Sequence, residues 1–131
     1  MYTMEVRTDR REQMVDVTRD VDVAVRESGV SDGWALVYSP HTTAAVCVNE
    51  NADPDVPADV LDALSQLCPE VWSWRHTEGN ADAHTKAVMV GESSTIPVSG
   101  GSLALGTWQG IFLCEFDGPR RRTLTVTVAG R

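Results

Sequence analysis

The sequence is poor in basic residues. Its 131 residues carry 19 acidic against 11 basic side chains, a formal net charge of −8 at pH 7, and Lys86 is the only lysine. A nucleic-acid-binding surface needs clustered Lys and Arg to displace counterions from phosphates, so we expect no nucleic acid partner. The acidic, lysine-poor composition suits a protein kept soluble in a salt-rich cytoplasm. A GC-rich genome that exchanges lysine for arginine explains the lysine bias nearly as well.

Long apolar runs and paired cysteines are also missing. No stretch approaches the roughly 18 apolar residues that cross a bilayer, and the charged N-terminus lacks the apolar core of a signal peptide. The three cysteines are far apart and form no CxxC motif, which gives no support to a zinc knuckle or a redox dithiol. We therefore expect a cytoplasmic protein without membrane contact, in which Cys47 and Cys114 pack as small apolar side chains.

Two hydrophobic periodicities organise the rest of the chain. Residues 122–130 alternate between apolar and polar side chains, as in a half-buried antiparallel strand. Residues 57–68 carry an apolar stripe at helical spacing. Further strands are expected at 2–8, 33–40, 43–50, 94–99, 102–105 and 107–116, and further helices at 18–29 and 83–91. We predict a single α+β domain over residues 1–131, with antiparallel sandwich-like sheets and two or three packed helices.

All three histidines, His41, His76 and His84, lie in polar, turn-rich segments. Imidazole is a preferred zinc ligand, and three imidazoles with one water form a catalytic zinc arrangement. Their spacing does not match HExxH, so spacing alone favours three unrelated surface histidines over a shared metal site.

Charged residues near these histidines suggest further site candidates. Glu50 follows an apolar strand and Glu78 lies just after His76; a carboxylate there could orient an imidazole or accept a proton. His41 and Glu50 are nine residues apart, about 30 Å in an extended strand, so they would meet more easily between subunits of a homo-oligomer than within one chain. Lys86 is either an anion contact or a lysine that extends along the surface to solvent.

Four segments, HTTAAVCVNENADPDV, EGNADAHTKA, STIPVSGGSLALGTWQGIFLCEFDGPRRR and TVTVAG, resemble in this order the YjbQ-like family, whose members are also labelled secondary thiamine-phosphate synthases. The resemblance runs from about residue 4 to the C-terminus. It implies an α+β sandwich, commonly assembled as a homotrimer, with a metal-associated histidine site. Together with the spacing of His41 and Glu50, this predicts a site at the subunit interface.

The resemblance also implies roles for individual residues. A divalent metal, zinc or (for a diphosphate substrate) magnesium, would be held by His41, His76 and His84. Catalytic roles would fall to Glu50, Glu78 and Lys86. Substrate binding would fall to Thr42, Thr43, Asn51, Thr107 and Gln109.

The activity implied by the resemblance is a weak thiamine-phosphate synthase reaction, which joins a pyrimidine diphosphate to a thiazole phosphate and releases diphosphate. Histidine is an unusual ligand for a magnesium–diphosphate site, because Mg²⁺ prefers carboxylates and water. Two alternatives therefore stay open. One is a zinc hydrolase that activates water on three histidines, with Glu50 as the base. The other is a non-enzymatic, oligomeric protein that binds a metal or a small ligand.

Overall fold

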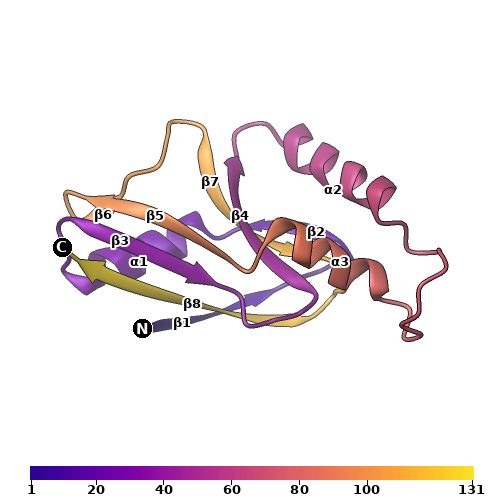
Figure 1. Cartoon of the computed structure of the whole chain (residues 1–131). Helices are drawn as coiled ribbons and strands as arrows, with labels where there is room; N and C mark the ends of the chain where they lie inside the picture. Colours follow the sequence, from indigo (N-terminus) through magenta and orange to yellow (C-terminus); the bar gives the residue numbers. More distant parts are fainter.

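Eight strands and three helices make up the computed structural model, which describes residues 1–131 (Figure 1). The strands are β1 (Tyr2–Arg7), β2 (Gln13–Asp16), β3 (Gly33–Tyr38), β4 (Ala44–Glu50), β5 (Ser93–Ser99), β6 (Ser102–Leu103), β7 (Gln109–Glu115) and β8 (Arg121–Gly130). The helices are α1 (Thr18–Ser28), α2 (Asp55–Leu67) and α3 (Ala81–Val90).

The strands form two antiparallel sheets. The five-stranded sheet has the order β1-β8-β3-β5-β6, and the three-stranded sheet has the order β2-β7-β4. The long strand β8 pairs with both β1 and β3, and the alternation predicted for it is present because Leu124 and Val126 are fully buried. The predicted α+β class, with sandwich-like antiparallel sheets and two or three helices, is confirmed, and the helices number three.

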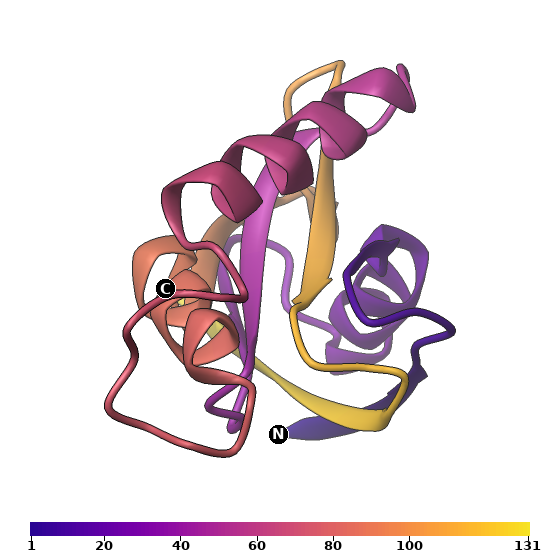
Figure 2. The same ribbon diagram turned by 90° about the vertical axis from the view of Figure 1, so that its right-hand side faces the viewer.

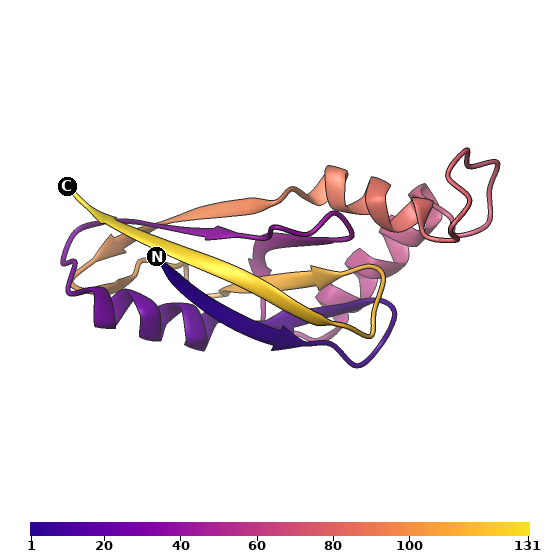
Figure 3. The ribbon, with the colours of Figure 1, turned by 90° about the horizontal axis from the view of Figure 1, so that it is seen from below.

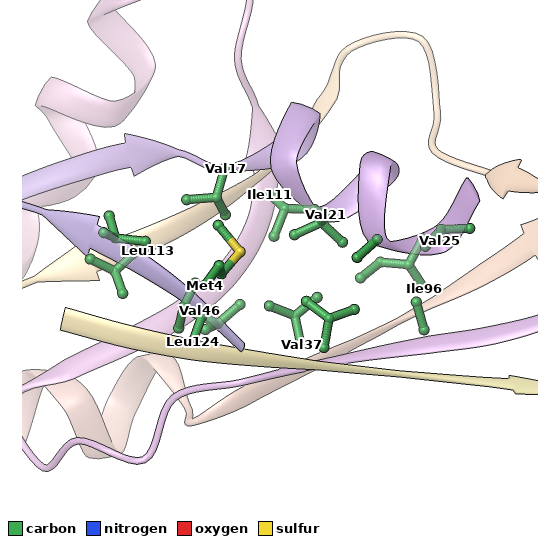
Figure 4. Close-up of a cluster of buried hydrophobic side chains, with 14 of the residues drawn as sticks. Met4, Val17, Val21, Val25, Val37, Val46, Ile96, Ile111, Leu113 and Leu124 are labelled. Atoms are coloured by element: carbon green, nitrogen blue, oxygen red, sulfur yellow. The ribbon is translucent and has the colours of Figure 1, made fainter. Parts of the chain in front are cut away.

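The main core lies between the two sheets and α1 (Figure 4). Val21 and Val25 of α1 meet Val37 of the five-stranded sheet and Ile111 of the three-stranded sheet in one cluster. Fully burying one such aliphatic side chain contributes about 1.5–3 kcal/mol, so this cluster fixes how the sheets face each other.

The other face of the three-stranded sheet forms a second, smaller core. Because side chains alternate along a strand, Phe112 and Cys114 of β7 point away from the main core and pack with Ala83 of α3. Figure 2 shows α2 and α3 on one side of β4 and β7, with α1 on the other. The helix α2 has no fully buried residue, so its apolar stripe is only half covered.

The helices lie at two ends of the molecule. Figure 3 shows α1 near one end of the five-stranded sheet, and α2, α3 and the connecting residues 68–80 at the other. None of the three helices is long and apolar enough to span a membrane. All three cysteines are free; Cys68 and Cys114 are buried and Cys47 is half-buried.

One local feature differs from the sequence-based expectation. The short strand β2 was not predicted, because its four residues have no clear alternation. The helix expected at 18–29 is present as α1. Asp16 accepts the Thr18 backbone N–H at 2.9 Å, and the Thr18 hydroxyl accepts the N–H of Ile111 at 2.8 Å. The helix ends in a left-handed cap at Gly29, with φ of 74°.

Candidate functional site

A polar pocket of about 400 Å³ opens where three segments meet: the residues before β4, the start of α3 and the turn between β7 and β8. None of its lining residues is hydrophobic. We call it the polar pocket; it is lined by Pro40, His41, Thr42, Thr43, Glu78, Asn80, His84, Asp117, Arg120 and Arg122.

His41 is held in the polar pocket by the backbone of one residue on β8. Its Nε2 lies 2.9 Å from the N and 3.1 Å from the O of Thr123. When Nε2 is unprotonated it accepts the Thr123 N–H, and when it carries a proton it donates to the Thr123 carbonyl. Either state of the ring therefore keeps a partner on Nε2, and Nδ1 has no hydrogen-bond partner in the chain.

The surroundings of His41 favour its neutral form. Burial lowers the pKa of His41, and the positive charge of Arg122 lowers it further. We expect an NMR titration of the folded protein to give His41 a pKa below the ordinary value of about 6.5. In urea the shift should vanish. Because the pKa of His41 is lower in the folded state, the neutral ring contributes to stability fully above the ordinary value, and this contribution is lost as the pH falls through the folded-state pKa. A measured pKa at or above 6.5 in the folded protein would contradict the assignment.

A buried ion pair supports one wall of the polar pocket. Arg122 donates from Nε to Glu115 at 2.9 Å and pairs with the second carboxylate oxygen through Nη2. The same Nη2 lies 2.9 Å from the Thr43 hydroxyl and so fixes that side chain. Burial would raise the pKa of Glu115, but hydrogen bonds from Arg122, the Asp117 N–H and Thr8 hold it below its ordinary value. The pair is therefore charged at neutral pH.

A second hydrogen-bonded chain fixes other residues that line the polar pocket. His76 Nε2 lies 3.0 Å from Asn80 Oδ1, Asn80 donates to Asp117 at 2.8 Å, and Arg120 donates to the same oxygen at 3.0 Å. The rings of His76 and His84 pack edge to face, with centroids 5.2 Å apart. These contacts tie the start of α3 to the turn between β7 and β8.

An aromatic pocket of about 620 Å³ adjoins the polar pocket, and the two share His84. It is lined by Trp72, Ser73, Trp74, Arg75, His76, Ala81, His84 and Thr85. Trp72 and Trp74 pack edge to face with centroids 4.9 Å apart. The WSWR segment, which had no predicted role, therefore forms one wall of a cavity next to the histidines.

The predicted site residues other than Lys86 fall into two groups in the structure. His41, Thr42, Thr43, Glu78 and His84 line the polar pocket, and His76 lines the aromatic pocket.

The second group lies at the far end of β4 and β7, away from both pockets. Glu50 is opposite Gln109 in the sheet, and Asn51 donates to Asp16 at 3.0 Å. Gln109 accepts the Gly106 N–H at 2.8 Å, and Thr107 is exposed in the same turn.

Lys86 lies in neither pocket. It is 1% exposed, and its Nζ lies 2.9 Å from Asp82, 3.1 Å from Glu12 and 3.4 Å from the Ser65 hydroxyl. Asp82 is also bound by Arg11. The charge of the only lysine is thus used inside a buried ionic cluster that joins α2, α3 and the N-terminal segment.

Sequence reasoning missed five residues of this region. One of them had a visible signal: Glu115 is the single charge within the apolar run IFLCEF, and a charge in such a run needs a buried partner. The others depend on contacts between distant segments and carry no local pattern. The missed residues are Asn80, Asp117 and Arg120, together with the pair Glu115 and Arg122.

The fold and the pocket together define a class: an α+β sandwich of two antiparallel sheets with a histidine-lined polar pocket at one end. The chain matches the profile of the family described as UPF0047 protein YjbQ-like over residues 2–131. It belongs to this family, as the resemblance predicted.

Relatives in other organisms match over nearly their full lengths. A UPF0047 protein of Methanocaldococcus jannaschii is 49% identical, covering 99% of this chain and 94% of the relative. The protein YugU of Bacillus subtilis is 47% identical, covering 99% of each chain. A YjbQ/UPF0047 structure from Clostridium acetobutylicum has a TM-score of 0.97 and 48% identity, covering 98% of this chain and 100% of that one. A structure from Sulfolobus solfataricus has a TM-score of 0.95 and 37% identity, covering 99% and 96%.

These findings correct the predicted functions. No group of three or more His, Cys, Asp or Glu side chains is arranged to hold a metal ion. Nε2 of His41 faces Thr123, and Nε2 of His76 faces Asn80. The names of these relatives mention no synthase or hydrolase activity. The Sulfolobus structure is described as a protein of unknown function. The metal-associated thiamine-phosphate synthase, the three-histidine zinc hydrolase and the non-enzymatic metal- or ligand-binding protein are therefore wrong as predictions. Zinc and magnesium as cofactors stay predictions.

Proposed function

We propose that the protein is a general acid–base catalyst that acts on a small molecule bound in the polar pocket, with His41 as the group that transfers the proton. The observation that carries this proposal is the position of His41 Nε2 between the N–H and the carbonyl of Thr123. Proton transfer at Nδ1 uses the tautomer in which Nε2 carries a proton and donates it to the Thr123 carbonyl, so the ring needs no reorientation during the reaction.

The electrostatics of the polar pocket suit this role. A general base works best when it is unprotonated at the working pH and its pKa is not far below that pH; for histidine the unprotonated form is the neutral one. Burial and Arg122 keep His41 in its neutral form. His84 lines the same pocket and provides a second group able to donate or accept a proton.

The aromatic pocket supports a substrate with a planar ring. It meets the polar pocket at His84, and the indole rings of Trp72 and Trp74 offer faces and edges for stacking. A ring bound there would place an attached polar group near His84 and His41. We place this reaction in the cytoplasm, where the three free cysteines would stay reduced.

Phenylpyruvate is a suitable probe, because it combines an aromatic ring, a carboxylate and carbon-bound hydrogens that exchange by proton transfer alone. We expect the wild-type protein to accelerate exchange of these hydrogens in D₂O. We expect His41→Gln to lose about 10²–10⁴-fold of the acceleration. Proton NMR measures the exchange directly.

The matched control is Glu27→Gln, which removes an exposed acid–base group on α1 outside the polar and aromatic pockets. This variant should retain the wild-type rate. Acceleration that survives in folded His41→Gln, or no acceleration by the wild-type protein, would contradict the proposal for this class of substrate.

We also propose that the protein is a homotrimer with its site at the subunit interface. Large apolar side chains are exposed on α3, at the end of α2 and in the residues between them: Leu67, Val71, Trp72, Val88 and Met89. Contact between subunits would cover this surface, and it would also complete the half-covered α2. It could bring the Glu50 end of β4 in one subunit to the His41 end in the next.

The variant Val88→Asp tests the assembly, because it puts a charge on a side chain that is 82% exposed in the isolated chain. We expect light scattering after gel filtration to show a trimer for the wild-type protein and smaller species for Val88→Asp. Val23→Asp on α1, where the valine is also exposed, should leave the trimer intact. A monomeric wild-type protein would refute the proposed assembly.

A further inference from the structure

Six of the ten arginines lie in two short segments, residues 7–11 and 120–122, which β1 and β8 bring together. Three of these six line a small pocket of about 300 Å³ with no hydrophobic residue. We call it the arginine pocket; it is lined by Arg7, Thr8, Asp9, Pro119, Arg120 and Arg121. In a chain of net charge −8, such a concentration of positive charge needs an explanation.

The register of the sheet places two of these arginines face to face. Arg7 and Arg121 are direct partners in the antiparallel pair of β1 and β8, and like charges at such positions repel. The charge of Arg121 is partly balanced by an ion pair with Glu5 at 3.2 Å. Arg7 makes no ion pair or side-chain hydrogen bond within the chain, although Asp9 lines the same pocket.

We infer that the arginine pocket binds a small oxyanion, a carboxylate or a tetrahedral anion, between Arg7 and Arg121. Guanidinium groups present paired N–H donors that match the two oxygens of such an anion. An anion between the two side chains would relieve their repulsion. Arg120, which Asp117 holds at 3.0 Å, would stand at the side of the bound group.

The position of Arg120 connects the arginine pocket to the polar pocket, since this residue lines both. A molecule anchored by its anionic group at Arg7 and Arg121 could extend past Arg120 toward His41. This second step rests on the proposed acid–base function, whereas anion binding itself does not. The ligand class is then a small molecule with an oxyanion at one end and a proton-exchanging group at the other.

Isothermal titration calorimetry with inorganic phosphate and, separately, with malonate tests the inference and distinguishes tetrahedral from carboxylate anions. We expect the wild-type protein to bind at least one of them. We expect Arg7→Ala and Arg121→Ala each to raise the dissociation constant by about tenfold or more, because each removes one charged hydrogen-bonding partner of the anion. Both side chains are exposed, so the variants should fold.

Two control variants separate the possible outcomes. Arg131→Ala changes the net charge equally at the exposed C-terminus and should bind like the wild type; an equal loss there would reduce the effect to overall charge and overturn the site. His41→Gln should retain anion binding, so a failure of the acid–base function would leave this result intact. Absence of binding to either anion at millimolar concentrations would overturn the inference.

The location of the bound anion can be read from backbone amide NMR shifts. We expect the largest shifts at residues 7–9 and 120–122, where the arginine pocket lies. Shifts centred on another region, such as the start of α1 with its Arg19, would also overturn the assignment.

Discussion

Replacement of Arg122 by methionine should destabilise the protein by about 3–5 kcal/mol, the range found when one partner of a buried ion pair is removed. The remaining Glu115 carboxylate is fully buried, and it would keep only the Thr8 hydroxyl and a backbone N–H as partners. Urea denaturation followed by circular dichroism measures the loss.

Two further variants test the cause of this loss. The double variant Arg122→Met with Glu115→Leu should recover most of the stability, because well-packed apolar residues can replace a buried ion pair without a penalty. Arg121→Met, one residue earlier and exposed, should change the free energy of unfolding by less than about 1 kcal/mol. Similar losses for Arg121→Met and Arg122→Met would refute a special role for the buried pair.

The same pair should make stability depend on pH. The pKa of Glu115 in the folded state is below its ordinary value, so its stabilising effect is complete above that value and is lost as the pH falls through the folded-state pKa. The difference in stability between wild type and Arg122→Met should therefore shrink as the pH falls toward the folded-state pKa of Glu115 in the wild type, because protonation of Glu115 removes the unpaired buried charge of the variant.

Lys86→Met should be the second strongly destabilising substitution, with a loss of about 3 kcal/mol. It removes a cation from a cluster in which the Asp82 carboxylate is fully buried. Arg11 would still bind Asp82, which places the expected loss at the lower end of the range for buried pairs. Thermal and urea unfolding should both report it.

A pair with the same helical spacing but on the surface provides the matched control. Arg26 and Asp22 on α1 are four residues apart and 2.8 Å from each other, and the arginine side chain is 67% exposed. Arg26→Met should cost no more than about 0.5 kcal/mol, as for solvent-exposed pairs in helices. If Lys86→Met and Arg26→Met reduce the free energy of unfolding by equally small amounts, burial does not determine how much the Lys86 cluster contributes to stability.

The sequence predicted the parts of the fold that depend on local periodicity. Alternation identified β8, and an apolar stripe between two prolines identified α2. The strand β2 was not predicted, because Gln13–Asp16 is short and has no alternation of buried and exposed side chains; only its pairing with β7 defines it.

The site was predicted only in part, because some of its residues are recognisable locally and others depend on contacts between distant segments. His41 and His84 could be found because histidine is rare in this chain and chemically distinctive. Their partners could not be found: Thr123 is 82 residues from His41 in sequence, and Asn80 meets Asp117 across 37 residues. The burial of Lys86 could not be predicted, because it depends on contacts with Glu12 and Ser65 from other elements.

Three consecutive residues at the start of β8 each serve a different part of the molecule. Arg121 reaches the arginine pocket, Arg122 enters the interior to meet Glu115, and Thr123 holds His41. A slip of this strand by one position would turn each side chain to the opposite face of the sheet. All three arrangements would then be lost together with the burial of Leu124 and Val126, so an inserted residue that shifts this register should disrupt the site and the main core at once.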